Sequence, residues 1–142
     1  MNKTKMMQMA RELLKKQLSN EWPRSRCACG DWGATDLAHI VYTRHPDSAD
    51  LYSRANCVLL HNKCNTTGEA LWININACLI ILKRVGGPDL WEEWAKMIPR
   101  KGQFWIPEKM VVGMELWEKG VRPYDFQPIM DYLADRPVVG GK

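Results

Sequence analysis

The chain has 142 residues, of which 46% are hydrophobic and 25% are charged, a balance typical of one soluble globular domain. The longest apolar run, residues 77–82, is far shorter than the roughly 20 residues of a transmembrane helix, and no signal-peptide core follows Met1. We therefore expect an intracellular protein with no membrane association. Essentially all of the net charge of +4 lies in residues 1–26, which hold seven Lys and Arg against two Glu.

Residues 1–23 are predicted to form a basic amphipathic N-terminal helix, which spans residues 2–21 and ends at Trp22-Pro23. Its apolar residues recur at helical spacing and its Lys and Arg residues surround the rest of the helix. A basic segment of this kind attracts phosphate backbones without reading sequence. The alternative is a solvated face with no partner.

Two pairs of potential metal ligands bracket the next segment. Cys27 and Cys29 lie in a turn-rich stretch, residues 24–33, and His61 and Cys64 lie where a strand passes into a helix. Thiolate and imidazole are the ligands that Zn²⁺ prefers, and five cysteines without a secretion signal favour metal binding over disulfides. We expect one structural zinc on these four residues. The alternative is a metal-free site with ordinary buried cysteines, which is the role expected for Cys57 and Cys78.

Between the ligand pairs, residues 34–43 and 57–60 are predicted to be short strands of a hairpin, because they are rich in β-branched and apolar residues. Residues 44–50 contain Pro, Asp and Ser and are predicted to be a loop.

The rest of the chain is predicted to be helical. Helices are expected at residues 68–85, 88–98, 107–120 and 127–135, and residues 137–142 are expected to be a flexible tail. The expected fold is therefore α+β and mostly helical. Its parts are the N-terminal helix, a zinc-bearing core over residues 24–86 and a helical C-terminal region over residues 87–136.

The order of residues from 24 to 68, about a third of the chain, resembles a known family. A Cys pair followed by Gly30, a strand containing His39-Ile40, Asn56 just before an apolar strand, and the closing Cys64-Asn65 are all similar to the zinc-bearing HNH nucleases. The variant that they resemble most is the phage recombination endonuclease VII type. The resemblance implies a ββα-metal fold and an endonuclease that hydrolyses phosphodiester bonds of DNA, including branched or structured DNA.

The resemblance also implies roles for particular residues. His39 would be the general base, Asn56 would fix the loop and the base, and Asn65 would bind a catalytic Mg²⁺ or Mn²⁺ ion. An imidazole with a pKa near 6.5 suits the task of the base. The expected partner is DNA, in the cytoplasm of a bacterial or phage-infected host, with a homodimer or a DNA-processing complex as further expectations. The candidate DNA-binding residues are Arg44, Lys15, Lys16, Arg24 and Arg26.

One position departs from the family pattern. The residue before the base is usually Asp or His and helps to hold the metal, but here it is Ala38, which has no donor atom. Residues two apart in a strand share a face, so Asp36 is the candidate replacement, with His45, Asp47 and Asp50 as further candidates. The alternative function is a catalytically inactive zinc-bearing module that binds DNA or protein, in which His39 is an ordinary core histidine.

Overall fold

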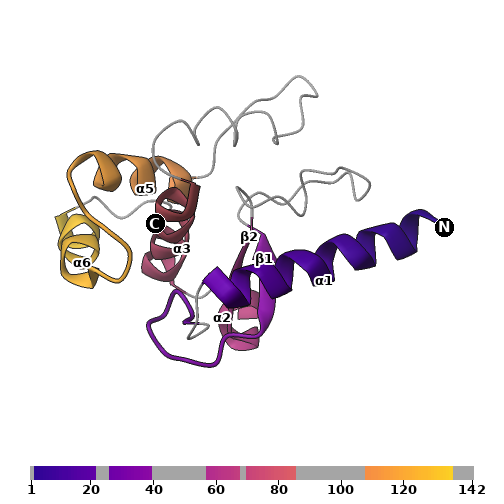
Figure 1. Cartoon of the computed structure of the whole chain (residues 1–142). Helices are drawn as coiled ribbons and strands as arrows, with labels where there is room; N and C mark the ends of the chain where they lie inside the picture. The colour runs from indigo at the N-terminus through magenta and orange to yellow at the C-terminus, as the bar shows by residue number, and fades with distance from the viewer. Residues whose placement is uncertain (1, 22–25, 40–56, 68–69, 86–107, 136–142) are drawn as a thin grey trace, which may run out of the picture.

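The computed structural model describes residues 2–21, 26–39, 57–67, 70–85 and 108–135 (Figure 1). Its elements in chain order are α1 (Lys3–Glu21), β1 (Asp36–His39), β2 (Cys57–Leu60), α2 (Asn62–Thr67), α3 (Leu71–Val85), α5 (Glu108–Glu118) and α6 (Phe126–Asp135). The fold is mostly helical with a small two-stranded sheet, as the sequence predicted. The predictions for the loop 44–50, the helix 88–98, the tail 137–142 and three candidate residues, Asn56, Arg24 and Arg44, lie outside the described residues.

Helix α1 runs toward the sheet from the N-terminal end and packs against β2 with its C-terminal half (Figure 1). Asn2 caps the helix, because its side-chain oxygen accepts a hydrogen bond of 2.8 Å from the backbone N–H of Lys5. Leu14 and Leu18 are buried, whereas Leu13 keeps 61% of its surface exposed. A helix over nearly all of the predicted residues 2–21 is thus confirmed, although Met6, Met9 and Leu13 of its predicted apolar face are exposed.

The two strands form an antiparallel pair, with Asp36 opposite Leu60, Leu37 opposite Leu59, Ala38 opposite Val58 and His39 opposite Cys57. The second strand has the predicted bounds, residues 57–60. All four of its residues are apolar and buried, which is why the apolar run marked it in the sequence. The first begins two residues later than predicted, at Asp36, and its predicted end lies outside the described residues. Within the described residues each strand has four residues, and a pair of this length buries little apolar surface of its own.

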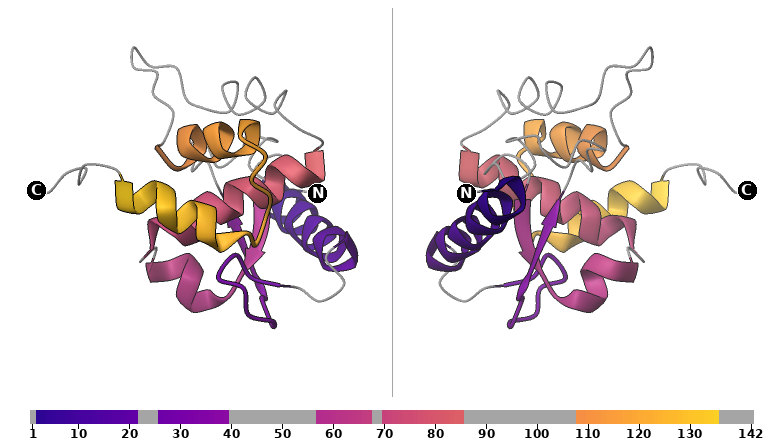
Figure 2. Two further views of the ribbon diagram at one scale, coloured as in Figure 1. Left: turned by 90° about the vertical axis from the view of Figure 1, so that its left-hand side faces the viewer. Right: turned by 90° about the vertical axis from the view of Figure 1, so that its right-hand side faces the viewer.

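Helix α3 is the centre of the core, between the hairpin and the pair α5 and α6 (Figures 1 and 2). Residues 75–82 of this helix are all buried, which explains why it is apolar over most of its surface. The helix begins at Leu71 instead of residue 68, and the carbonyl of Ala70 accepts its first hydrogen bonds. At its C-terminal end Arg84 donates a 2.8 Å hydrogen bond to the carbonyl of Cys57, which ties α3 to the hairpin.

Helix α5 ends in a Schellman motif at Gly120. The backbone N–H of Val121 donates to the carbonyl of Leu116, the N–H of Gly120 donates to the carbonyl of Trp117, and Gly120 has a φ of +92°. Glycine adopts this left-handed conformation without strain, which explains the stop there. The helices predicted for residues 107–120 and 127–135 are confirmed within one residue at their starts, and α5 ends two residues earlier than predicted, at Glu118.

Helices α3 and α5 approach each other closely at Gly113. A Cβ atom added at Gly113 would lie 2.9 Å from Cβ of Cys78, a fully buried residue of α3. Gly113→Ala is therefore expected to lower the free energy of unfolding by about 1–3 kcal/mol, measured by urea denaturation. Helix propensity alone would make the same substitution stabilising by about 1 kcal/mol. An increase in stability would thus show that the helices have room to separate.

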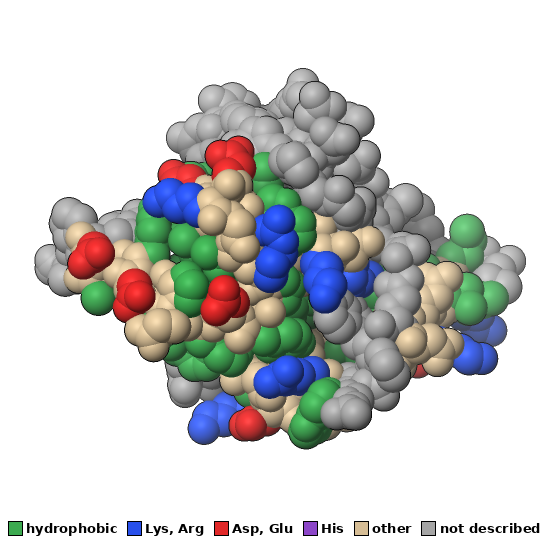
Figure 3. All heavy atoms as spheres, turned by 60° about the vertical axis from the view of Figure 1, so that its left-hand side comes forward, with side chains coloured by type: hydrophobic (Ala, Val, Ile, Leu, Met, Phe, Trp, Pro, Cys, Tyr) green, Lys and Arg blue, Asp and Glu red, His purple; other side chains and the backbone are tan. Residues whose placement is uncertain are grey.

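Charge is distributed unevenly over the elements. Helix α1 carries five cations, Lys3, Lys5, Arg11, Lys15 and Lys16, against Glu12 and Glu21. Residues 108–135 carry three, Lys109, Lys119 and Arg122, against six acids, Glu108, Glu115, Glu118, Asp125, Asp131 and Asp135. The face that includes α5 and α6 accordingly shows both signs of charge (Figure 3). Of the helices described, none is both long and apolar enough for a transmembrane span.

Candidate metal centre

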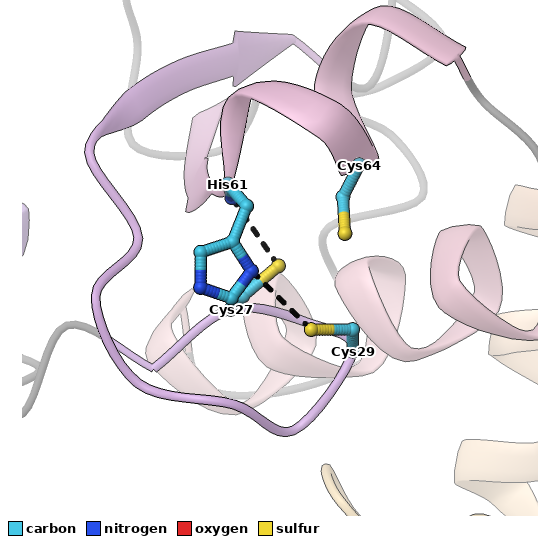
Figure 4. A group of neighbouring side chains, drawn as sticks. All are labelled: Cys27, Cys29, His61 and Cys64. Carbon is cyan, nitrogen blue, oxygen red and sulfur yellow. Dashed lines mark hydrogen bonds between the residues drawn. The ribbon is translucent and has the colours of Figure 1, made fainter.

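Four side chains from two separate segments converge beside the hairpin. The ligand atoms of Cys27, Cys29, His61 and Cys64 all lie within 4.8 Å of one another (Figure 4). Cys27 and Cys29 come from the loop before β1, His61 follows β2, and Cys64 lies on α2. Three thiols and one imidazole are a known donor set of structural zinc sites. The four predicted residues could therefore hold a metal ion such as zinc.

The loop from Cys27 to Asp31 is closed by its own backbone. The N–H of Gly30 donates a 2.9 Å hydrogen bond to the carbonyl of Cys27, and the N–H of Cys27 donates a 3.0 Å bond to the carbonyl of Asp31. Gly30 has a φ of +101°, which a residue with a Cβ atom rarely adopts. This tight turn lets two cysteines separated by one residue present both thiols on the same side.

The orientation of His61 matches that of a metal ligand. Its Nε2 lies 2.7 Å from the carbonyl oxygen of Trp32, which can only accept, so Nε2 carries the proton and donates it. Nδ1 is then the nitrogen with the free lone pair, and it lies 3.4 Å from Sγ of Cys29. The same carbonyl raises the pKa of His61 above its ordinary value. A histidine ligand commonly donates its second N–H to a carbonyl in this way.

The thiols of the cluster lie close to one another and to a backbone donor. The backbone N–H of His61 donates to Sγ of Cys27 at 3.4 Å. Burial, and after it the neighbouring thiols of Cys27 and Cys29, raise the pKa of Cys64 to about 12. Bound zinc deprotonates a coordinating thiol outright. A divalent cation would thus relieve the crowding of three sulfur atoms at this point.

The two remaining cysteines lie outside the cluster. Cys57 in β2 and Cys78 in α3 are fully buried, and burial raises the pKa of each thiol to about 12. Such thiols stay protonated and unreactive near neutral pH. The prediction that both are buried apolar residues is confirmed.

His39, the predicted general base, is the last residue of β1 and is half-buried. Burial lowers the pKa of its imidazole, and the positive charge of Arg11 on α1 lowers it further. His39 is therefore neutral near pH 7, which is the state that can accept a proton. The charge of Arg11 thus acts on the pKa of His39 in the same direction as burial.

The predicted ligands of a catalytic cation are placed on β1 and α2. Asp36 is the first residue of β1, and its carboxylate accepts a 2.8 Å hydrogen bond from the side-chain amide of Asn62. Asn65 is exposed on α2, directly after Cys64. Ala38, by contrast, is 4% exposed opposite Val58 and contributes only to the core. The assignment of Asp36 and Asn65 to a cation stays a prediction.

The predicted DNA-binding residues have different surroundings. Lys16 is exposed and Lys15 is half-buried on α1. Arg26 is held by the protein itself, because its Nε donates a 2.7 Å hydrogen bond to the carbonyl of Gly30 and its guanidinium lies 4.3 Å from the ring centre of Tyr124. This cation–π contact fixes the side chain beside the metal loop. A role for these three residues in binding DNA stays a prediction.

Three residues of this region were not predicted as part of the site. The carbonyl of Trp32 orients His61, and Asn76 and Tyr124 bond the loop that carries Cys27. No sequence signal marks a backbone carbonyl as a partner of a metal ligand.

Comparison with models of protein families, with curated proteins and with solved structures finds no match to this chain.

Proposed function

We propose that this protein is a metal-dependent DNA endonuclease of the HNH type. The observation that carries the proposal is the convergence of Cys27, Cys29, His61 and Cys64, which joins the loop before β1 to the start of α2. This convergence supports an arrangement of two antiparallel strands and a helix around one metal centre. Such an arrangement is what the resemblance to the ββα-metal nucleases implies.

Two further observations favour a nuclease. A neutral histidine stands at the end of the first strand, and an asparagine follows the last cysteine on the helix. The cations Arg11, Lys15 and Lys16 on α1 supply positive charge for a phosphate backbone, whereas the surface of residues 108–135 has an acidic excess. DNA would therefore approach from the side of α1.

In the proposed mechanism, His39 takes a proton from a water molecule, and the resulting hydroxide attacks the phosphorus atom as the bond to the leaving sugar oxygen breaks. The lowered pKa of His39 keeps the imidazole ready to accept that proton at neutral pH. A Mg²⁺ or Mn²⁺ ion held by Asn65 and Asp36 would stabilise the charge on the phosphate and the leaving oxygen. The zinc has a separate, structural role.

The experiment that tests the proposal is cleavage of supercoiled plasmid and of branched DNA by the purified protein. We expect nicking in Mg²⁺ or Mn²⁺ and none when a chelator removes the divalent cation. Binding to the same DNA is measured in parallel by a mobility-shift assay at several salt concentrations. Absence of cleavage with every divalent cation, under conditions where DNA is bound, would contradict the proposal.

A second candidate is a zinc-bearing module that binds DNA or protein without cutting. The observation that favours it is the burial of Ala38, because the family's usual metal ligand at that position is missing and its place is filled by core. This candidate predicts DNA binding that weakens steeply with salt, without cleavage in any divalent cation. The same two assays therefore distinguish the candidates.

The pH dependence of nicking gives a further prediction. Because burial and then Arg11 lower the pKa of His39, the acid limb of the rate profile is expected at a pH below the ordinary value of about 6.5. The nicking rate should be at its maximum above pH 6.5 and should fall as the pH drops through the lowered pKa of His39. Arg11→Ala should move the midpoint upward, toward 6.5, whereas Lys5→Ala on the same helix should not. An unchanged midpoint in Arg11→Ala would contradict the effect of α1 on the base.

A further inference from the structure

Two residues from the C-terminal half of the chain hold the loop that carries Cys27 and Cys29. Asn76 on α3 donates a 2.9 Å hydrogen bond from its side-chain nitrogen to the carbonyl of Ala28. Its side-chain oxygen accepts a 2.7 Å bond from the backbone N–H of Tyr124. Asn76 is the one fully buried polar side chain in the described part of the chain. Its amide thus joins two segments that are 48 residues away from it in either direction.

Tyr124, just before α6, contacts the same loop with its side chain. Its hydroxyl donates a 2.9 Å hydrogen bond to the carbonyl of Arg26, and its ring lies under the Arg26 guanidinium. Burial raises the pKa of Tyr124 to about 12, so the hydroxyl remains a donor at neutral pH. Tyr124 also has a φ of +68°, in the left-handed region that residues other than glycine seldom adopt. Such a conformation persists only where the surroundings fix it.

The two carbonyls that receive these hydrogen bonds lie directly before two metal ligands. The carbonyl of Arg26 belongs to the peptide group before Cys27, and the carbonyl of Ala28 belongs to the peptide group before Cys29, so the peptide group that precedes each cysteine is anchored from the C-terminal half. The ring of Phe126 adds a steric limit, because a Cβ atom at Gly30 would lie 3.2 Å from it. Cys27 is the most buried of the four ligands and has the least freedom to correct a displaced backbone.

We propose that Asn76 and Tyr124 are positioning residues for the metal centre, and that zinc binding is linked through them to the docking of the segment before α6. Such linkage is reciprocal. If the hydrogen bonds of Asn76 and Tyr124 to the cysteine loop raise zinc affinity, bound zinc stabilises those hydrogen bonds by the same factor. The C-terminal half is then part of the metal site, although it supplies none of its ligands. This inference concerns zinc binding alone and does not depend on the proposed nuclease activity.

The test is zinc affinity, measured by competition with a chelating indicator, in the full chain and three variants. Tyr124→Phe removes the hydroxyl but keeps the ring under Arg26, and we expect about 3- to 10-fold weaker zinc binding. Asn76→Ala removes both amide contacts, and about 10- to 100-fold weaker binding is expected. The matched control is Tyr132→Phe, which removes a hydroxyl bonded to Glu115 on α5, away from the metal loop, and should bind zinc as the parent does.

The two tyrosine variants decide the outcome even if Asn76→Ala does not fold. Equal zinc affinity in parent, Tyr124→Phe and Tyr132→Phe would overturn the proposal, as would equal losses in the two variants. The linkage is tested separately in the parent protein. Removing zinc should speed hydrogen exchange of the Tyr124 backbone amide by roughly 10-fold or more. Exchange at that amide that is the same with and without zinc would also overturn it.

Discussion

Replacing His39 with alanine is expected to slow plasmid nicking in Mg²⁺ by about 10²- to 10⁴-fold, the usual contribution of a general base. The reason is that the variant lacks the neutral imidazole that accepts the proton of the attacking water. DNA binding should remain within a few-fold of the parent, because α1 and its cations are unchanged. Rates are measured under single-turnover conditions with enzyme in excess over plasmid.

A structural role for His39 would also lower activity, and chemical rescue separates the two explanations. Added imidazole should restore part of the nicking rate of His39→Ala, because a free base can occupy the space left by the side chain. The melting temperature of the variant, measured in parallel, reports any loss of fold. Nicking by His39→Ala at the rate of the parent would rule out the proposed mechanism.

Removing zinc from the protein is expected to lower its melting temperature by roughly 10 °C. A ligand present at 1,000 times its dissociation constant stabilises the folded state by about 4 kcal/mol, and each kcal/mol moves the melting temperature of a chain of this size by about 3 °C. The loss should be concentrated in the hairpin and the Cys27 loop, where two strands of four residues provide little core. The measurement is thermal unfolding by circular dichroism with and without a chelator.

Two cysteine variants make this result specific. Cys64→Ser removes a ligand, so the chelator should have no further effect on its melting temperature. Cys78→Ala leaves a gap in the core and lowers stability by itself, but the chelator should still lower its melting temperature as in the parent. If the chelator leaves the melting temperature of the parent unchanged, the structure is not stabilised by a bound metal.

The sequence predicted most of the local structure, because helices and strands are encoded by residues that are close together in the chain. The strand Cys57–Leu60 is a short apolar run, and α3 is apolar over most of its surface and has basic residues in its last turn. The four candidate ligands could also be predicted, because two closely spaced Cys or His pairs joined by a hairpin are typical of a zinc site.

What the sequence could not supply are contacts between distant segments. The amide of Asn76 reaches a carbonyl 48 residues before it, and the hydroxyl of Tyr124 reaches one 98 residues before it. In the sequence, Asn76 is simply a polar residue within an apolar helix, and its partners are backbone atoms that any residue possesses. The lowered pKa of His39 likewise depends on burial and on Arg11, 28 positions away. Such features follow from packing, which is fixed only when the whole chain has folded.

The central claim, that Cys27, Cys29, His61 and Cys64 form a zinc centre, is tested most directly by the metal content of the purified protein. Inductively coupled plasma mass spectrometry should find one zinc ion per chain in the parent and in Cys78→Ala, and much less in Cys64→Ser. Parent protein that contains no zinc and takes up none from solution would contradict the claim.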